Sequence, residues 1–181
     1  MEILQQIRWD ILFPIITFIL GLSYSLIDKY MERKREKENL KTVLFYEIAR
    51  NHYMLYKLPD WGKDIKSMIR WAAAAQSLEY SIYEEYLGKI NVLMPDELNA
   101  VLSAYSSIEF TIKRGNDYME YLGKNVEDED FDNELHEAHA KSLQYSIEQT
   151  QRLLSVAVEV FAEGREDLLK KLQSLYPDSP S

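Results

Sequence analysis

The chain lacks cysteine and has few glycines and prolines. Its 181 residues include 0 Cys, 6 Gly and 5 Pro. The absence of cysteine excludes disulfide bonds, thiolate zinc sites and cysteine nucleophiles. The small numbers of Gly and Pro argue against a turn-rich β-sandwich and a glycine-rich nucleotide-binding fold. The Walker loop, the G-x-S-x-G elbow, H-E-x-x-H and the dinucleotide glycine motif are also missing, so no common enzyme class is indicated.

The chain is acidic, but its charge is unevenly distributed. It has 30 Asp and Glu against 21 Lys and Arg, a net charge of −9, which argues against a nucleic-acid partner. Residues 28–57 carry eight basic and five acidic side chains, whereas residues 58–181 carry twelve basic and twenty-three acidic ones. An apolar content of 46% argues against disorder, and the length suits one domain.

An uncharged apolar run lies near the start of the chain. Residues 11–27 read ILFPIITFILGLSYSLI and lie between two aspartates. As a helix they span about 25 Å, close to the roughly 30 Å of a bilayer's hydrocarbon core. Trp9 and Tyr30 flank the run, and such aromatic residues are enriched at membrane interfaces. We therefore predict a transmembrane helix over residues 11–30, in which Pro14 either kinks the helix or marks its start.

A signal peptide and a buried helix of a soluble domain are the alternative interpretations of this run. The starting sequence MEILQQIRWD is not basic, as a signal peptide would be, and DKYMERKREKEN after the run lacks a small-residue cleavage site. One basic residue, Arg8, precedes the run, and six follow it: Lys29, Arg33, Lys34, Arg35, Lys37 and Lys41. The positive-inside rule then places residues 1–10 outside and the C-terminal part in the cytoplasm. These six membrane-proximal basic residues also suit anionic lipid headgroups.

Helical periodicity continues through most of the remaining chain. A stripe at steps of three and four, with no Gly or Pro nearby, predicts that the first helix continues to just before Pro59: Leu40, Leu44, Ile48, Asn51, Leu55. Further helices are predicted over residues 63–76, from a Ser81–Glu84 capping box to Gly88, from Pro95 to Gly123, over 133–163 with Gly164 after it, and over 165–176. Gly115 lies on an apolar seam, which predicts a close helix approach.

No segment shows the period-two alternation of a strand. The expected fold is therefore all-α: a transmembrane helix continuing into an antiparallel bundle of about four to five helices. We expect the bundle to occupy residues 31–176 and residues 177–181 to form a frayed tail.

Glu47 and Asn51 form a candidate polar pair beside the apolar stripe of the first helix. They are four residues apart and so share one helix face. One interpretation is a polar pocket in the bundle, with Tyr105 or Glu109 as neighbours. The other is a hydrogen-bonded pair that fixes helix register.

Only three histidines are available for metal binding: His52, His136 and His139. No histidine lies three residues after a Glu, so the Glu-x-x-His motif of di-metal bundles is absent. His136 and His139 are three apart and Glu134 is close in sequence, which makes them candidate metal ligands. The alternative is a first helical turn that carries two partly exposed histidines. We expect no cofactor and identify no catalytic residue.

Two stretches, ERKREKENLKTVLFYEIARNHYML and SIYEEYLGKINVLMPDELNAVLSAYSSIEF, resemble small bacterial membrane proteins with one N-terminal transmembrane helix and an uncharacterised helical cytoplasmic domain. The resemblance implies the same layout and a location in the bacterial inner membrane. It adds no catalytic residue.

The favoured interpretation is a single-pass, membrane-anchored helical domain that acts in protein–protein interaction or assembly. Its expected partners are the membrane and either another protein or a second copy. A membrane-associated sensor that signals through the continuous first helix, and a metal-binding helical-bundle enzyme, are the alternatives.

Overall fold

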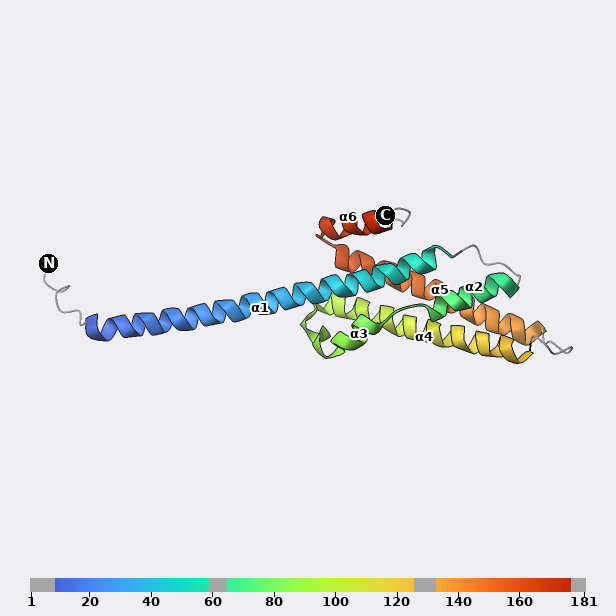
Figure 1. Ribbon diagram of the computed structural model, residues 1–181, viewed down its shortest axis with the longest axis horizontal. Coiled ribbons are helices and arrows are strands. Elements are labelled where there is room, and N and C mark those ends of the chain that lie inside the picture. The colour runs from blue at the N-terminus through green and yellow to red at the C-terminus, as the bar shows by residue number, and fades with distance from the viewer. Residues whose placement is uncertain (1–8, 59–64, 126–132, 177–181) are drawn as a thin grey trace. The chain divides into compact units, whose positions relative to one another are not determined.

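A computed structural model describes residues 9–58, 65–125 and 133–176 of the chain (Figure 1). Every secondary-structure element in these ranges is a helix, which confirms the all-α prediction for the described residues. In chain order they are α1 (Trp9–Tyr56), α2 (Ile65–Gln76), α3 (Ser81–Tyr86), the 3₁₀ helix η2 (Leu87–Val92), α4 (Pro95–Asn125), α5 (Asn133–Ala162) and α6 (Glu166–Leu175). The predicted N-terminal segment, apart from its last residues, and the predicted tail lie outside the described ranges.

The chain divides into two units, Met1–Asn39 and Leu40–Ser181. The folded domain therefore begins at Leu40, nine residues later than the expected start at residue 31. Leu40 is the first buried residue of the apolar stripe, whereas most side chains from 31 to 39 are exposed. The boundary thus lies where the helix gains a face that can be buried.

The described part of the first unit is helical, with an apolar surface from Leu12 to Ile27 and exposed charged side chains from Asp28 onwards. Helix α1 already begins at Trp9, so Pro14 lies inside the helix and does not mark its start. The hydroxyl of Thr17 donates to the carbonyl of Phe13 at 2.9 Å, and that of Ser23 donates to the carbonyl of Ile19 at 2.8 Å. These hydroxyls are therefore satisfied within the helix, as an apolar environment requires.

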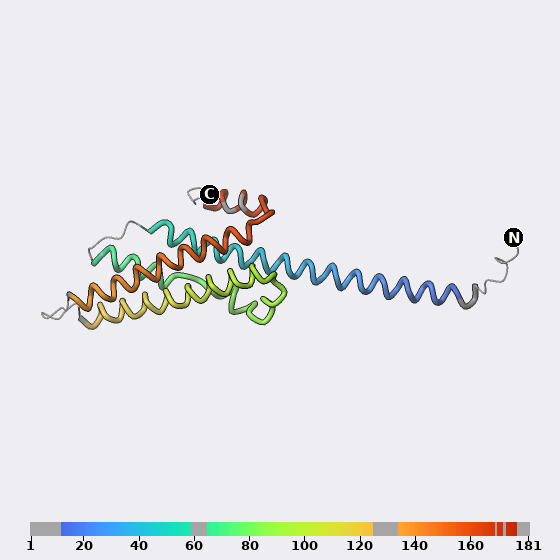
Figure 2. The backbone as a smooth tube through the Cα atoms, turned by 180° about the vertical axis from the view of Figure 1, so that it is seen from behind, coloured from blue at the N-terminus to red at the C-terminus, as the bar shows by residue number. Residues whose placement is uncertain are grey.

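The second unit contains the hydrophobic core. Figures 1 and 2 show residues 40–56 of α1, then α2, α4 and α5, side by side, each running opposite to the one before. Every member of the predicted stripe of α1 is buried: Leu40, Leu44, Ile48, Asn51 and Leu55. The core is completed by apolar faces of α2, α4 and α5, including Trp71, Ile108 and Leu143. Helical periodicity in the sequence therefore located these buried faces correctly.

The structure confirms the roles predicted for Gly115 and Gly164 but not the one predicted for Gly123. A Cβ atom on Gly115 would lie 2.9 Å from Cβ of Ala75, which confirms the predicted close approach and identifies α2 as the neighbour. Gly164 follows α5 with φ +69°, as the predicted end of that helix requires. Gly123 is not a cap, because α4 continues to Asn125. This prediction was wrong because the seam of α4 supplies packing up to Leu122.

Buried hydroxyls and aromatic rings join further helices of the second unit. Thr111 of α4 and Thr150 of α5 lie with their hydroxyl oxygens 2.8 Å apart, and Thr150 donates to the carbonyl of Ser107 at 3.1 Å. The ring of Tyr176, just after α6, lies 4.4 Å from that of Tyr53 on α1. These groups are used for helix packing.

Candidate functional site

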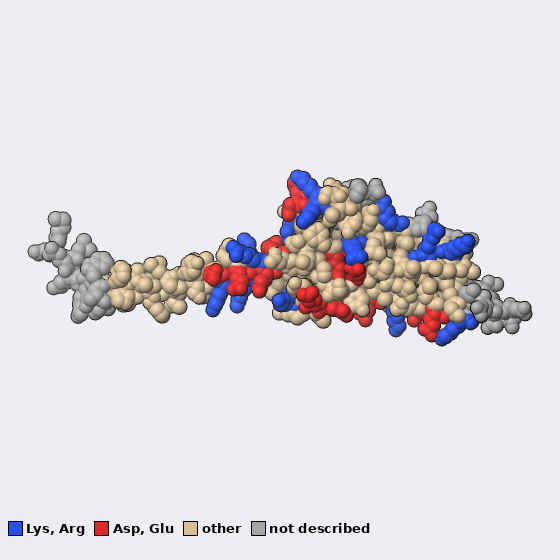
Figure 3. All heavy atoms as spheres, viewed as in Figure 1, with Lys and Arg blue, Asp and Glu red and all other residues tan. Residues whose placement is uncertain are grey.

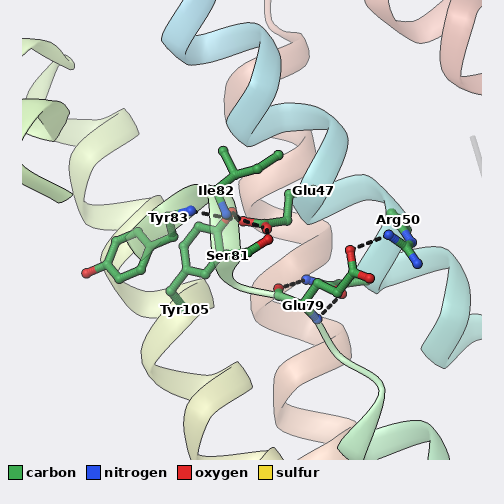
Figure 4. A network of polar contacts seen from close by, with 8 residues as sticks. Glu47, Arg50, Glu79, Ser81, Ile82, Tyr83 and Tyr105 are labelled. Atoms are coloured by element: carbon green, nitrogen blue, oxygen red, sulfur yellow. Dashed lines mark hydrogen bonds and ion pairs between the residues drawn. The ribbon is translucent and has the colours of Figure 1, made fainter. Parts of the chain in front are cut away.

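Glu47 is the most buried carboxylate among the described residues. It accepts four hydrogen bonds. Its side chain is 4% exposed. One oxygen accepts the backbone N–H of Ile82 at 2.9 Å and the hydroxyl of Ser81 at 3.4 Å. The other accepts the N–H of Tyr83 at 3.2 Å and the hydroxyl of Tyr105 at 2.6 Å. Figure 4 shows these donors converging on Glu47 from α3 and α4.

Glu47 caps the N-terminus of α3, a role that the sequence analysis assigned to Ser81. The residue before α3 is Tyr80, which makes no side-chain cap, and Ser81 is already the first helical residue. The free N–H groups of Ile82 and Tyr83 bond instead to the carboxylate of Glu47. The predicted capping box was therefore wrong. A buried charge that reaches across from α1 satisfies these donors better than an exposed local hydroxyl. The α-helix ends at Tyr86, two residues before the predicted end at Gly88, and the chain continues as the 3₁₀ helix η2 to Val92.

Tyr105 supplies a protonated hydroxyl to this network. Its ring stacks on that of Tyr83 at 4.3 Å with an interplanar angle of 13°. Burial first, and then the hydrogen bond to Glu47, raise the pKa of Tyr105 far above its usual value of 10.0. The hydroxyl therefore stays protonated at neutral pH and acts as a fixed donor to the carboxylate.

Asn51 and Arg50 bind Glu79, which lies two residues before α3. The side chain of Asn51 accepts the N–H of Glu79 at 2.9 Å and donates to the carbonyl of Glu79 at 2.6 Å. Arg50 forms an ion pair with the Glu79 carboxylate, in a more exposed position. Glu47 and Asn51 thus each bond to the segment 79–83, and neither needs the other as its partner. We call Glu47, Arg50 and Asn51 with segment 79–83 the α1 clasp (Figure 4).

The α1 clasp has the properties of a structural joint. Tyr105, one of the two neighbours suggested from the sequence, donates to the clasp residue Glu47 from α4, whereas Glu109 lies exposed on α4. All four donors to Glu47 are protein groups, so the carboxylate is already satisfied. Glu79 had no distinguishing sequence signal, because its backbone atoms make both bonds to Asn51.

The histidine cluster is held by aromatic contacts. The ring of His139 stacks on Tyr121 at 4.8 Å, and the ring of His136 lies 5.8 Å from that of Tyr118. Burial and the neighbouring His139 lower the pKa of His136. Among the described residues, no group of three or more His, Asp or Glu side chains is placed to hold a metal ion. Glu134, His136 and His139 therefore do not form a three-ligand site.

The six predicted basic residues fall into two environments. Lys41 lies in the second unit, where its ammonium is 2.5 Å from a carboxylate oxygen of Glu97 and both side chains are 12% exposed. Glu97 also accepts the N–H of Met94 at 2.8 Å at the start of α4. Lys41 is thus part of a helix-start ion pair. The other five lie in the first unit, four of them exposed and one half-buried: Lys29, Arg33, Lys34, Arg35 and Lys37.

The apolar run forms an exposed surface. Large side chains from Leu12 to Met31 are between 37% and 74% exposed. The helix is long and apolar enough to cross a membrane, and none of its most apolar 18-residue window is buried. The buried-helix interpretation therefore loses its support in this fold, because a core helix would be covered.

No family model matches the chain, and searches of curated proteins and of solved structures give no match. The resemblance to small bacterial membrane proteins therefore stays a prediction.

Proposed function

We propose that the protein is a single-pass membrane protein whose helical domain, from Leu40 onwards, lies in the cytoplasm and binds another protein or a second copy. The observation that carries the proposal is the uncovered apolar surface of α1. Exposed apolar area of this extent is rare on soluble monomers, whereas a bilayer would cover it completely.

The charge distribution supports the orientation. Five basic residues follow the apolar run within ten residues, and one precedes it: Lys29, Arg33, Lys34, Arg35 and Lys37 against Arg8. Segments rich in Lys and Arg remain on the cytoplasmic side during insertion. The N-terminus would then lie outside.

The interior of the domain supports an interaction role over an enzymatic one. The buried polar side chains with the most reactive chemistry are engaged internally: Glu47 with four donors, and Glu97 with Lys41 and Met94. What the domain offers to other molecules is its acidic surface, which suits recognition of a protein partner.

Cysteine labelling tests the membrane topology directly, because the natural chain has no cysteine. Single variants Gln5→Cys and Ser103→Cys would be treated in intact bacterial cells with a membrane-impermeant maleimide. We expect labelling at position 5 in intact cells and at position 103 only after permeabilisation. The reverse pattern would refute the orientation, and release of the protein by alkaline carbonate would refute the anchor.

Crosslinking tests the interaction role. Two differently tagged copies would be co-expressed and crosslinked in native membranes before solubilisation and sizing. Recovery of both tags in one species indicates a second copy as partner, and a heavier species with one tag indicates another protein. A species of monomer size alone would count against an assembly role.

A further inference from the structure

Six of the nine charged residues at positions 28–38 of α1 form two lines of like sign, and the other three, Lys34, Arg35 and Glu38, lie outside these lines. An α-helix turns 100° per residue, so residues four apart lie nearly above one another. Asp28, Glu32 and Glu36 form one such line, the acidic line. Lys29, Arg33 and Lys37 form the next, the basic line. Figure 3 shows acidic side chains along the visible face of this stretch, with basic side chains both above and below them.

The basic line is open to external anions. Lys29 and Arg33 are exposed and Lys37 is half-buried. Among the described residues, no ion pair of these three side chains is found. Within each line like charges repel at the i,i+4 spacing, whereas Lys29/Glu32 and Arg33/Glu36 place opposite charges at i,i+3 across the lines. An external anion on the basic line would relieve that repulsion.

The distance along the helix favours lipid headgroups as that anion. Lys29 lies two residues beyond Ile27, the end of the uncharged run, and Lys37 lies ten beyond it. At 1.5 Å per residue these positions are about 3 Å and about 15 Å past the run. The headgroup layer is about 5–7 Å thick, and charge is felt about 8 Å beyond it at physiological ionic strength. The basic line therefore extends from the headgroup layer to about one Debye length beyond it, where the membrane's electrostatic potential is still felt.

We propose that the basic line binds the phosphate-bearing headgroups of anionic lipids in the leaflet where the helix emerges. The acidic line repels the same headgroups, so anionic lipid gathers along one side of the helix. The two lines together carry three positive and three negative charges. Lys34, Arg35 and Glu38 of the same stretch add a net charge of +1, so the role of the two lines is tested by rearranging their charges at constant net charge. The inference rests on the proposed membrane anchor.

An exchange of two neighbouring charges isolates this property. The double variant Glu32→Arg/Arg33→Glu keeps composition and net charge but breaks both lines. A matched control, Glu137→Lys/Lys141→Glu, exchanges two exposed charges that form an ion pair in α5. Full-length protein would be reconstituted in phosphatidylcholine vesicles that contain a trace of spin-labelled phosphatidylglycerol or spin-labelled phosphatidylcholine. Electron paramagnetic resonance then measures the fraction of each lipid held at the protein.

For the natural chain we expect about a fivefold preference for phosphatidylglycerol, which corresponds to about 1 kcal/mol. The preference should disappear in Glu32→Arg/Arg33→Glu and in 1 M salt, and remain in the α5 control. An equal preference in both exchange variants would overturn the proposal, as would displacement of the lipid by millimolar glycerol phosphate. Flotation with pure phosphatidylcholine vesicles separates the two hypotheses. A protein that floats without lipid preference refutes only the basic line, and one that does not float refutes the anchor and this inference together.

Discussion

Replacing Glu47 by glutamine tests whether the α1 clasp depends on a buried negative charge. Glutamine preserves the shape of the side chain but turns one acceptor oxygen into an NH₂ donor. Each oxygen of Glu47 receives one hydroxyl and one backbone N–H, from Ser81 and Ile82 or from Tyr105 and Tyr83. A hydroxyl can rotate to accept a hydrogen bond from the new NH₂ group, but a backbone N–H cannot. One buried N–H therefore loses its acceptor.

The expected magnitude follows from that one lost acceptor. A buried donor without a partner costs about 1–3 kcal/mol, so we expect Glu47→Gln to lower the free energy of unfolding by about 2 kcal/mol. Urea unfolding of the full-length protein in detergent micelles, followed by tryptophan fluorescence, measures it. Glu109→Gln is the matched control, because Glu109 is exposed, and it should change stability by less than about 0.5 kcal/mol.

Hydrogen exchange locates the effect within the chain. In Glu47→Gln, peptides that cover residues 79–83 should exchange faster than in the natural chain, while the middle of α5 should lose no more protection than the fall in global stability accounts for. A stability loss no larger than that of Glu109→Gln, or unchanged exchange in residues 79–83, would refute the role given to the carboxylate.

Gly115→Ala should destabilise the protein by about 1–2 kcal/mol in urea unfolding, because the new Cβ would lie 2.9 Å from that of Ala75. Gly123→Ala, whose Cβ would have nothing within 4 Å, should stabilise it by about 0.5–1 kcal/mol. The same sign for both would refute the close approach. Burial raises the pKa of Tyr105, so its stabilising contribution is present below pH 10 and lost above it. Tyr105→Phe should reduce the fall in stability between pH 10 and 11 by about 1 kcal/mol, and an unchanged fall would contradict the raised pKa. Burial lowers the pKa of His52 below 6.5. The stabilising contribution of the neutral imidazole is therefore present above pH 6.5 and is lost as the pH falls. His52→Gln should accordingly reduce the fall in melting temperature between pH 6.5 and pH 5.

The helices and their buried faces could be predicted because they follow a local rule. Apolar residues at steps of three and four identified the buried face of α1 from Leu40 to Leu55, and Pro95 with two following acids identified the start of α4. Gly164 ended α5 as expected, because a residue in the left-handed conformation is needed there. Each of these signals lies within a few residues of the structure that it determines.

The partners of buried polar groups could not be predicted, because they come from distant parts of the chain. The stripe marked Glu47 and Asn51 as lying beside the core, but Glu47 bonds to residues at least 34 positions away. The same competition made the local pattern at Ser81 misleading. Gly123 failed as a cap for a related reason, since packing of Tyr121 and Leu122 carries α4 past it. Tertiary contacts outweighed local preference in both places.

Lys41 distinguishes two roles of the basic residues that the sequence alone cannot separate: setting membrane orientation and binding lipid headgroups. In the proposed topology all six basic residues after the apolar run count toward orientation, because the positive-inside rule would act on the chain during insertion. Lys41 is then taken by Glu97, so it cannot serve as a headgroup ligand in the folded domain. Exchanging the pair as Lys41→Glu/Glu97→Lys should therefore leave lipid preference unchanged, while the single variant Lys41→Gln should destabilise the start of α4. A loss of lipid preference in the exchanged pair would show that the positive charge at position 41 itself contributes to headgroup binding, and would refute the restriction of that binding to the basic line.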